Sequence, residues 1–286
     1  MAARGSRAHP IAWWLLAGAV ALVVAGWATH PAWLHPASSV PCHVVHPDCG
    51  GNQWLLAWVA ERVLHGGGLL HNDRYYWPVG DTPFLAGNGG EGLLYAPLHL
   101  AFGWPVAANL HLVLLVGLNA LAAAWAARGA GASWPGALLA AAALGVSPYA
   151  MREFTAGRAV QGDLSWCLWY LGALLRLLEA PSVRRAVLAG ALLAVASCLY
   201  WYHGAFLGLA SLVLVLGTLP GRWRAGGLPW CPLGVLAVTA ALLAAGPLAW
   251  SFAHWGLLPG TAETGTFPHP EAVADSLRPA WPFLVK

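Results

Sequence analysis

The chain has 286 residues, of which 59% are hydrophobic and only 9% are charged. Soluble globular proteins carry about 25% charged residues, so this composition excludes an ordinary water-soluble fold and predicts an integral membrane protein. The formal net charge of +3 gives no general attraction to nucleic acid.

Apolar segments taken in chain order predict an all-α, polytopic transmembrane helical bundle. A spanning helix needs about 20 mostly apolar residues. The predicted spans are residues 11–28, 105–127, 133–150, 161–180, 184–201, 203–220 and 231–253. The apolar segment 92–102 is short and contains Pro97, so we expect a re-entrant or interfacial helix there, or an eighth span.

The first span predicts an uncleaved anchor, because the HPAWLHP that follows it is a poor cleavage site. Arg4 and Arg7 precede it and place the N-terminus in the cytoplasm. The predicted parts of the chain are a tip and first span (1–28), an extracytoplasmic loop (29–91) with an interfacial helix (52–66), a transmembrane bundle (92–253) and an extracytoplasmic tail (254–286).

This topology separates the charges. Acidic residues contribute little to insertion, so their nearly complete confinement to the outer side indicates another purpose and predicts the chemistry there. Only Glu179 is an inner acid. The inner cations are Arg4, Arg7, Arg128, Arg176, Arg184, Arg185, Arg222 and Arg224. The outer acids are Asp48, Glu61, Asp73, Asp81, Glu91, Glu153, Asp163, Glu263, Glu271 and Asp275.

The long outer loop holds a helix pattern and two cysteines. The helix carries a stripe of apolar residues with two tryptophans, which suits a helix lying in the membrane interface or one packed on the bundle. Cys42 and Cys49 allow a disulfide in an oxidising compartment. Free thiols, or a metal site with His43 and His46, are the alternatives.

Three outer stretches carry candidate site residues. Asp48 follows the first span and precedes the loop helix; helix capping or a solvated loop position would also explain it. Two arginines, Arg152 and Arg158, suit a phosphate, unless they pair with acids or extend to lipid headgroups. The turn with Tyr200, Tyr202 and His203 supplies aromatic surfaces for a sugar or an isoprenoid, together with a titratable group.

The order of these motifs resembles the glycosyltransferase-C superfamily of membrane enzymes, which use polyprenyl-phosphate-linked sugars. The matching motifs are the N-terminal anchor, the long first loop with Asp48, WLLAWVAERVLHGG, YYWPVGD, LYAPLHLAFGWPVAANLHLVL, SPYAMREFTAGR and YWYHG. The resemblance covers most of residues 11–253 and extends to the protein mannosyltransferase-like and aminoarabinose-transferase-like branches.

The resemblance implies an inverting sugar transfer in the bacterial inner membrane, with an active face outside the cytoplasm. It implies that Asp48 is the general base for an acceptor hydroxyl or a ligand of a divalent cation, Mg or Mn. Arg152 or Arg158 would hold the donor phosphate. Many members carry adjacent acids in the first loop, whereas Cys49 follows Asp48 here, so Asp81 or Glu91 would supply a second carboxylate.

Two other functions stay open at this stage. The chain is short for the superfamily, which favours a truncated or divergent member, or a non-catalytic scaffold. A transporter of a lipid-linked substrate would place ionisable residues within spans, and His111 is the main residue of that kind.

Overall fold

The computed structural model describes residues 10–40, 48–69, 71–72, 82–83, 89–224 and 229–254. The predicted all-α class is confirmed, since the described regular structure is helical apart from one two-residue antiparallel strand pair. In chain order the elements are α1 (Pro10–Ala28), α2 (His30–Leu34), α3 (Asp48–His65), β1 (His71–Asn72), β2 (Thr82–Pro83), α4 (Gly89–Phe102), α5 (Val106–Gly129), α6 (Trp134–Gly145), α7 (Pro148–Thr155), α8 (Ala159–Gly162), α9 (Ser165–Glu179), α10 (Val183–Leu199), α11 (Trp201–Arg224) and α12 (Trp230–His254).

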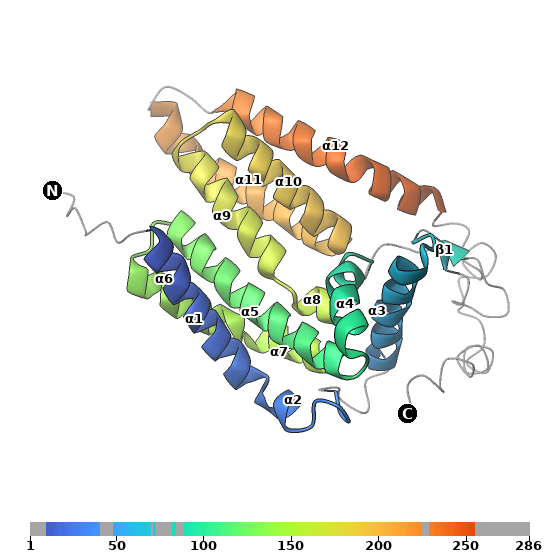
Figure 1. Ribbon diagram of the computed structural model, residues 1–286. Helices are drawn as coiled ribbons and strands as arrows, with labels where there is room; N and C mark the ends of the chain where they lie inside the picture. Colours follow the sequence, from blue (N-terminus) through green and yellow to red (C-terminus); the bar gives the residue numbers. More distant parts are fainter. Residues whose placement is uncertain are drawn as a thin grey trace.

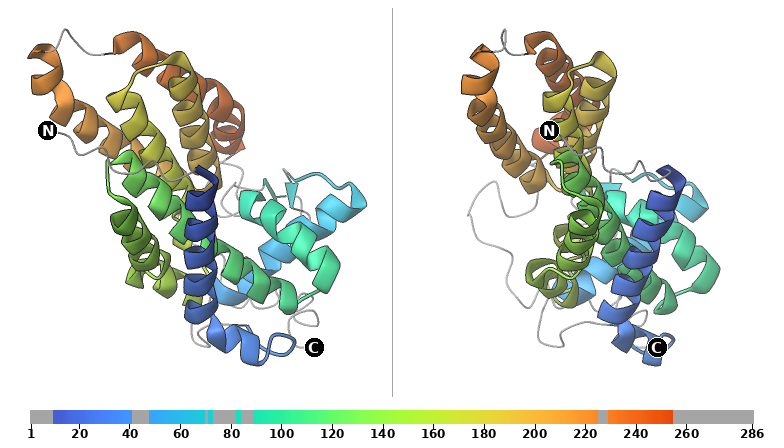
Figure 2. Two further views of the ribbon diagram at one scale, coloured as in Figure 1. Left: turned by 60° about the vertical axis from the view of Figure 1, so that its left-hand side comes forward. Right: turned by 90° about the vertical axis from the view of Figure 1, so that its left-hand side faces the viewer.

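The long helices run along one common direction, and the connections between them gather at two ends (Figure 1). One end holds the start of α1 and the α5–α6 and α9–α10 connections. The other holds α2, α3, α4, α7 and α8, with α3 and α4 projecting to one side (Figure 2). The fold therefore separates the arginine-rich connections from the segments that carry the candidate site.

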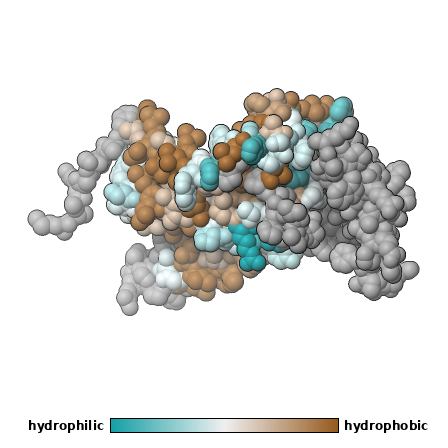
Figure 3. Space-filling view, turned by 90° about the horizontal axis from the view of Figure 1, so that it is seen from below, coloured by the Kyte–Doolittle hydropathy of each residue, from teal (hydrophilic) through white to brown (hydrophobic). Residues whose placement is uncertain are grey.

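Four of the described helices are long and apolar enough to cross a membrane, which indicates an integral membrane protein. Large apolar side chains on them face outward: Leu22 on α1 is 72% exposed and Leu242 on α12 is 74% exposed. A side of the molecule seen from below Figure 1 is apolar over much of its area (Figure 3). Contact with lipid accounts for such a surface. The four helical segments are Ile11–Ala28, Val106–Gly129, Trp201–Thr218 and Trp230–Pro247.

Three other predicted spans form helices too short to cross a bilayer alone, so seven or eight spans are not confirmed. α6, α9 and α10 have 12, 15 and 17 residues. At 1.5 Å per residue they measure about 18 to 26 Å, below the ~30 Å of a hydrocarbon core. The predicted span 133–150 is divided because Ser147 caps a new helix, its hydroxyl accepting from the Ala150 amide at 3.2 Å.

The predicted loop helix is present as α3, beginning four residues before the expected position 52. Its inner face packs on α4 and the start of α5, where Leu56 and Ala60 lie in one cluster with Tyr95 and Ala108. Val63, expected in the apolar stripe, is 44% exposed. Packing on the bundle, one of the two alternatives, is what these contacts show.

Small residues bring α1, α5 and α6 close together. Their shared core consists largely of alanines, and Trp13 on α1 closes it by an edge-to-face contact with Trp134 at 4.5 Å. Small side chains allow close backbone approach, which favours helix association where lipid supplies no hydrophobic drive. The buried alanines are Ala17, Ala21, Ala120, Ala124, Ala137 and Ala141.

Arginine side chains bind backbone carbonyls of the helices at the end of the bundle remote from α3 and α4. Arg176 donates to the carbonyls of Gly172 and Trp125, both at 2.8 Å, and its guanidinium lies 3.6 Å from the Trp125 ring centroid. Arg185 donates to the carbonyl of Ala180, just after α9, at 2.6 Å. Cations are favoured at helix C-termini, where carbonyls lack helical partners.

Candidate functional site

The start of α3 lies against the turn between α7 and α8. Gly157 in that turn has φ +76°, and a Cβ there would overlap the backbone of Cys49. Only glycine adopts this conformation readily and allows so close an approach. Asp48, the first residue of α3, is therefore placed by its backbone beside the turn that leads into Arg158.

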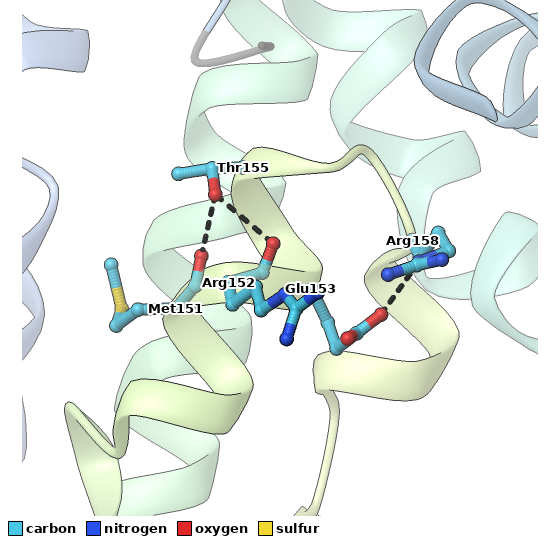
Figure 4. A network of polar contacts seen from close by, with 5 residues as sticks. All are labelled: Met151, Arg152, Glu153, Thr155 and Arg158. Carbon is cyan, nitrogen blue, oxygen red and sulfur yellow. Dashed lines mark hydrogen bonds and ion pairs between the residues drawn. The ribbon is translucent and has the colours of Figure 1, made fainter. Parts of the chain in front are cut away.

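The two arginines of this region have different surroundings. Arg158 Nε lies 2.6 Å from Glu153 Oε2, and Glu153 is only 6% exposed (Figure 4). A buried carboxylate requires a partner, so this ion pair holds the α7–α8 turn closed. Arg152 is exposed and forms no ion pair with a described residue. Pairing with an acid thus accounts for Arg158 but not for Arg152.

The predicted aromatic turn borders a groove of about 510 Å³ between α7, α9 and α11. Tyr200, Tyr202 and His203 line it together with Tyr149 and Phe206. Burial is the main cause that raises the pKa of Tyr200, and Glu153 and Arg158 also act on it, in opposite directions. The Glu153–Arg158 pair is therefore close enough to the groove to influence its tyrosines.

Glu91 lies in the protein interior, where His111 and Asp163 meet it. It is 1% exposed, and its Oε2 is 3.1 Å from His111 Nε2. Asp163 is 2% exposed and hydrogen-bonds to Glu91. The three residues come from α4, α5 and the α8–α9 junction, and we call them the buried triad.

Desolvation dominates the electrostatics of both acids in the triad. Burial raises the pKa of Glu91 to about 7, against a smaller lowering by the hydrogen bond with Asp163. Burial first, and then the charge of Glu91, raise the pKa of Asp163 to about 8. Charged carboxyl groups are costly in an apolar interior, so burial disfavours the state in which both acids are ionised near neutral pH.

Glycines beside Glu91 allow its helix to enter the core. A Cβ at Gly92 would overlap Val59 on α3, and one at Gly90 would overlap Leu199 on α10. The last glycines of GNGGEG, residues 87–92, thus allow close helix packing. Glu91 is carried into the interior and does not face the outer surface as a second site carboxylate would.

A small cavity of about 20 Å³ separates the triad from the start of α3. His111, Gln53 and Gly157 are among the residues that line it. A cavity needs about 10–15 Å³ to admit a water, so this one has room for one. The cavity therefore lies between His111 of the buried triad and Gly157 of the α7–α8 turn.

Several predicted site residues lie at or beyond the limits of the described structure. Asp81 and Cys42 are outside the described residues, and Asp48 is described only as part of α3. Cys49 is disulfide-bonded. In the part of the chain that the structure describes, no group of three or more His, Cys, Asp or Glu is placed to hold a metal ion. Metal binding by Asp48 stays a prediction.

Sequence reasoning brought Asp48, the arginine turn and the aromatic turn to one end, and the structure places their backbones there. It missed the buried triad, because Glu91, His111 and Asp163 were considered separately. The available signal was that each of the three is an ionisable residue set among apolar or glycine neighbours. Comparison of the chain with known protein families, with curated proteins and with solved structures finds no match.

Proposed function

We propose that the protein is a membrane glycosyltransferase that moves a sugar from a polyprenyl phosphate to an extracytoplasmic acceptor. The observation that carries the proposal is the meeting, at one end of the bundle, of the α3 start, the exposed Arg152 and an apolar groove lined by aromatic side chains. A lipid phosphate needs both an apolar channel for its chain and a cation for its headgroup.

The groove suits the isoprenoid chain. It lies among helices that include α11, whose segment Trp201–Thr218 is apolar enough to span a membrane, so a lipid can enter it from the bilayer. Aromatic rings on its wall, such as Tyr202, which stacks on Trp201, offer flat surfaces to a sugar or to the first isoprene units.

Arg152 is the better candidate for the donor phosphate, because Arg158 is already engaged by Glu153. A guanidinium binds two phosphate oxygens at once through its planar fork of donors. Arg158 acts in this scheme as a positioning residue that fixes the turn carrying Arg152.

The transfer step assigns Asp48 as the base. Its carboxylate takes the proton of an acceptor hydroxyl, whose oxygen attacks the anomeric carbon of the sugar. The bond between that carbon and the phosphate oxygen breaks with inversion, and polyprenyl phosphate leaves with its electron pair. A divalent cation held by Asp48 and Asp81 would stabilise the leaving phosphate.

The test uses purified protein in nanodiscs with a panel of short-chain polyprenyl-phosphate hexoses and pentoses, and measures released polyprenyl phosphate. We expect Asp48→Asn to lower turnover at least about 100-fold, whereas Glu179→Gln, an exposed acid at the opposite end, retains it. Turnover by Asp48→Asn equal to that of the wild type would refute the mechanism.

A binding measurement separates the phosphate site from the chemistry. Arg152→Gln should weaken binding of a short-chain polyprenyl phosphate about 10-fold, and Arg184→Gln at the other end should not. Equal binding by wild type and Arg152→Gln would contradict the assignment. A folded wild type that binds the lipid but transfers no sugar from the panel would favour the non-catalytic scaffold.

A further inference from the structure

The buried triad joins three separate elements through ionisable side chains. Glu91 lies in the first turn of α4 and His111 in α5, and Asp163 is the C-cap residue of α8, two residues before α9. All three side chains are more than nine-tenths buried. Such residues are rare inside membrane proteins and usually serve a function.

The carboxyl oxygens of the triad have few hydrogen-bond donors around them. Asp163 Oδ1 accepts the amide proton of Ser165 at 3.0 Å. When both carboxyl groups are ionised, Asp163 Oδ2 and Glu91 Oε1 accept no hydrogen bond from another described residue, and Glu91 Oε2 has only His111 Nε2, at 3.1 Å. Two facing carboxylates repel each other, but one proton placed between them converts the contact into a strong O–H···O bond.

The neighbouring charged groups do not neutralise this pair. Arg158, a cation on the adjoining α7–α8 turn, is paired with Glu153. On α4, the Tyr95 ring makes a T-shaped contact with the His111 ring, and its hydroxyl hydrogen-bonds to His99. His99 is in turn near Glu61 of α3. On α9 the neighbour of Asp163 is the thiol of Cys167.

We propose that the buried triad is a proton-binding site, in which Glu91 and Asp163 hold one proton between their carboxyl groups and His111 contacts the free side of Glu91. The bound proton lies on Asp163 Oδ2, because Oδ1 already accepts from Ser165. Occupancy fixes α4 against α5 and the α8–α9 junction. This site is separate from the proposed transferase function and does not depend on it.

The electrostatics of the pair agree with this arrangement. Burial raises the pKa of both acids, and their hydrogen bond acts upward on Asp163 and downward on Glu91. The two acids therefore resist simultaneous ionisation, as expected of a pair that holds one proton. The cavity beside His111, lined also by Gln53 and Gly157, provides a place for a water through which the proton can exchange.

Infrared spectroscopy of the full-length protein in nanodiscs tests the site directly. A protonated carboxylic acid gives a carbonyl band that ionised carboxylates lack. We expect such a band in the wild type near pH 6 and its loss by about pH 9. Asp163→Asn should abolish this titrating band, and Glu91→Gln should abolish it or shift it to lower pH. Glu179→Gln should leave it unchanged.

Two outcomes would overturn the proposal. One is a titrating band that persists unchanged in both Glu91→Gln and Asp163→Asn, because the band would then belong to other acids. The other is a thermal midpoint that rises with added Na⁺ at fixed pH in the wild type but not in Asp163→Asn, because a metal cation would then be the occupant. Where Asp163→Asn fails to fold, Glu91→Gln, whose amide can donate to Asp163, serves alone.

Discussion

Asn119 on α5 donates from Nδ2 to the carbonyl of Gly162 at 2.8 Å, and this bond holds the backbone immediately before Asp163. Both groups are buried. At the α8–α9 junction the Gly162 carbonyl also accepts from the Leu164 amide at 3.0 Å, so the inward-facing Asn119 side chain supplies a second donor from another helix. Asn119 thus positions the buried triad without belonging to it.

Replacing Asn119 by alanine should destabilise the protein by about 0.5–1.5 kcal/mol, because the buried Gly162 carbonyl would lose one of its two donors and keep only the Leu164 amide, at 3.0 Å. Thermal unfolding in detergent, followed by tryptophan fluorescence, measures the change. Asn109→Ala is a comparison at a second buried amide on α5, which donates instead to the carbonyls of Pro36 and Ser39. No loss of stability in Asn119→Ala would contradict the positioning role.

Stability should fall as the pH rises through neutrality. The folded-state pKa values of Glu91 and Asp163 are raised to about 7 and about 8, above the ordinary 4.5 and 3.8. The folded state therefore binds more protons than the unfolded state between about pH 4 and about pH 8. The stabilisation is complete below pH 4 and is lost as the two groups ionise.

The thermal midpoint measured across this range should drop by several degrees toward alkaline pH. In Glu91→Gln the fall of the thermal midpoint with pH should be smaller. One titrating acid is gone, and the amide of the glutamine donates the hydrogen bond that the shared proton made. A midpoint that rises with pH in the wild type, or an identical slope in the variant, would show that other groups control the pH dependence.

Gly92→Ala should weaken the packing of α4 on α3. The new Cβ would lie 2.5 Å from Val59 Cβ, so the two helices would have to separate. Overpacking of this kind costs about 1–3 kcal/mol, which unfolding in detergent would detect. Gly208→Ala on α11 is the matched control, because no atom lies within 4 Å of a Cβ there; its stability should be unchanged or slightly higher.

Breaking the Glu153–Arg158 pair should destabilise the α7–α8 turn. Arg158→Gln leaves the buried carboxylate of Glu153 without its 2.6 Å partner, and we expect a loss of about 1–3 kcal/mol. The double variant with Glu153→Gln should recover part of that loss, because no charge then remains buried. Additive effects of the two single changes would mean that the pair is not coupled.

Hydropathy located the complete spans closely but not the interrupted ones. Predicted spans 11–28 and 105–127 correspond to Pro10–Ala28 and Val106–Gly129. A continuous apolar run determines both the presence and the length of such helices. The predicted span 133–150 failed because Ser147 and Pro148 start a new helix inside it, an effect of local capping that average hydropathy does not register.

The sequence allowed the residue types at one end of the bundle to be predicted. It did not allow a prediction of which of those side chains contact one another. Glu91 was expected on the outer side because the predicted spans put it at the end of the first extracytoplasmic loop, residues 29–91. The structure instead uses Gly90 and Gly92 to fit α4 between α3 and α10. Which acid faces which depends on helix rotation and on tertiary contacts between distant segments, and neither can be inferred from the spacing within one segment.

The arginines at the remote end connect membrane orientation to tertiary packing. Arg176 lies over the Trp125 ring and donates to carbonyls of both α5 and α9, so its charge is part of the joint between two helices. A topogenic arginine on a flexible loop could be moved or deleted with little effect on folding. Here, removing Arg176 would take one positive charge from this end of the bundle and loosen the α5–α9 pair at the same time, so its loss should impair assembly of the bundle.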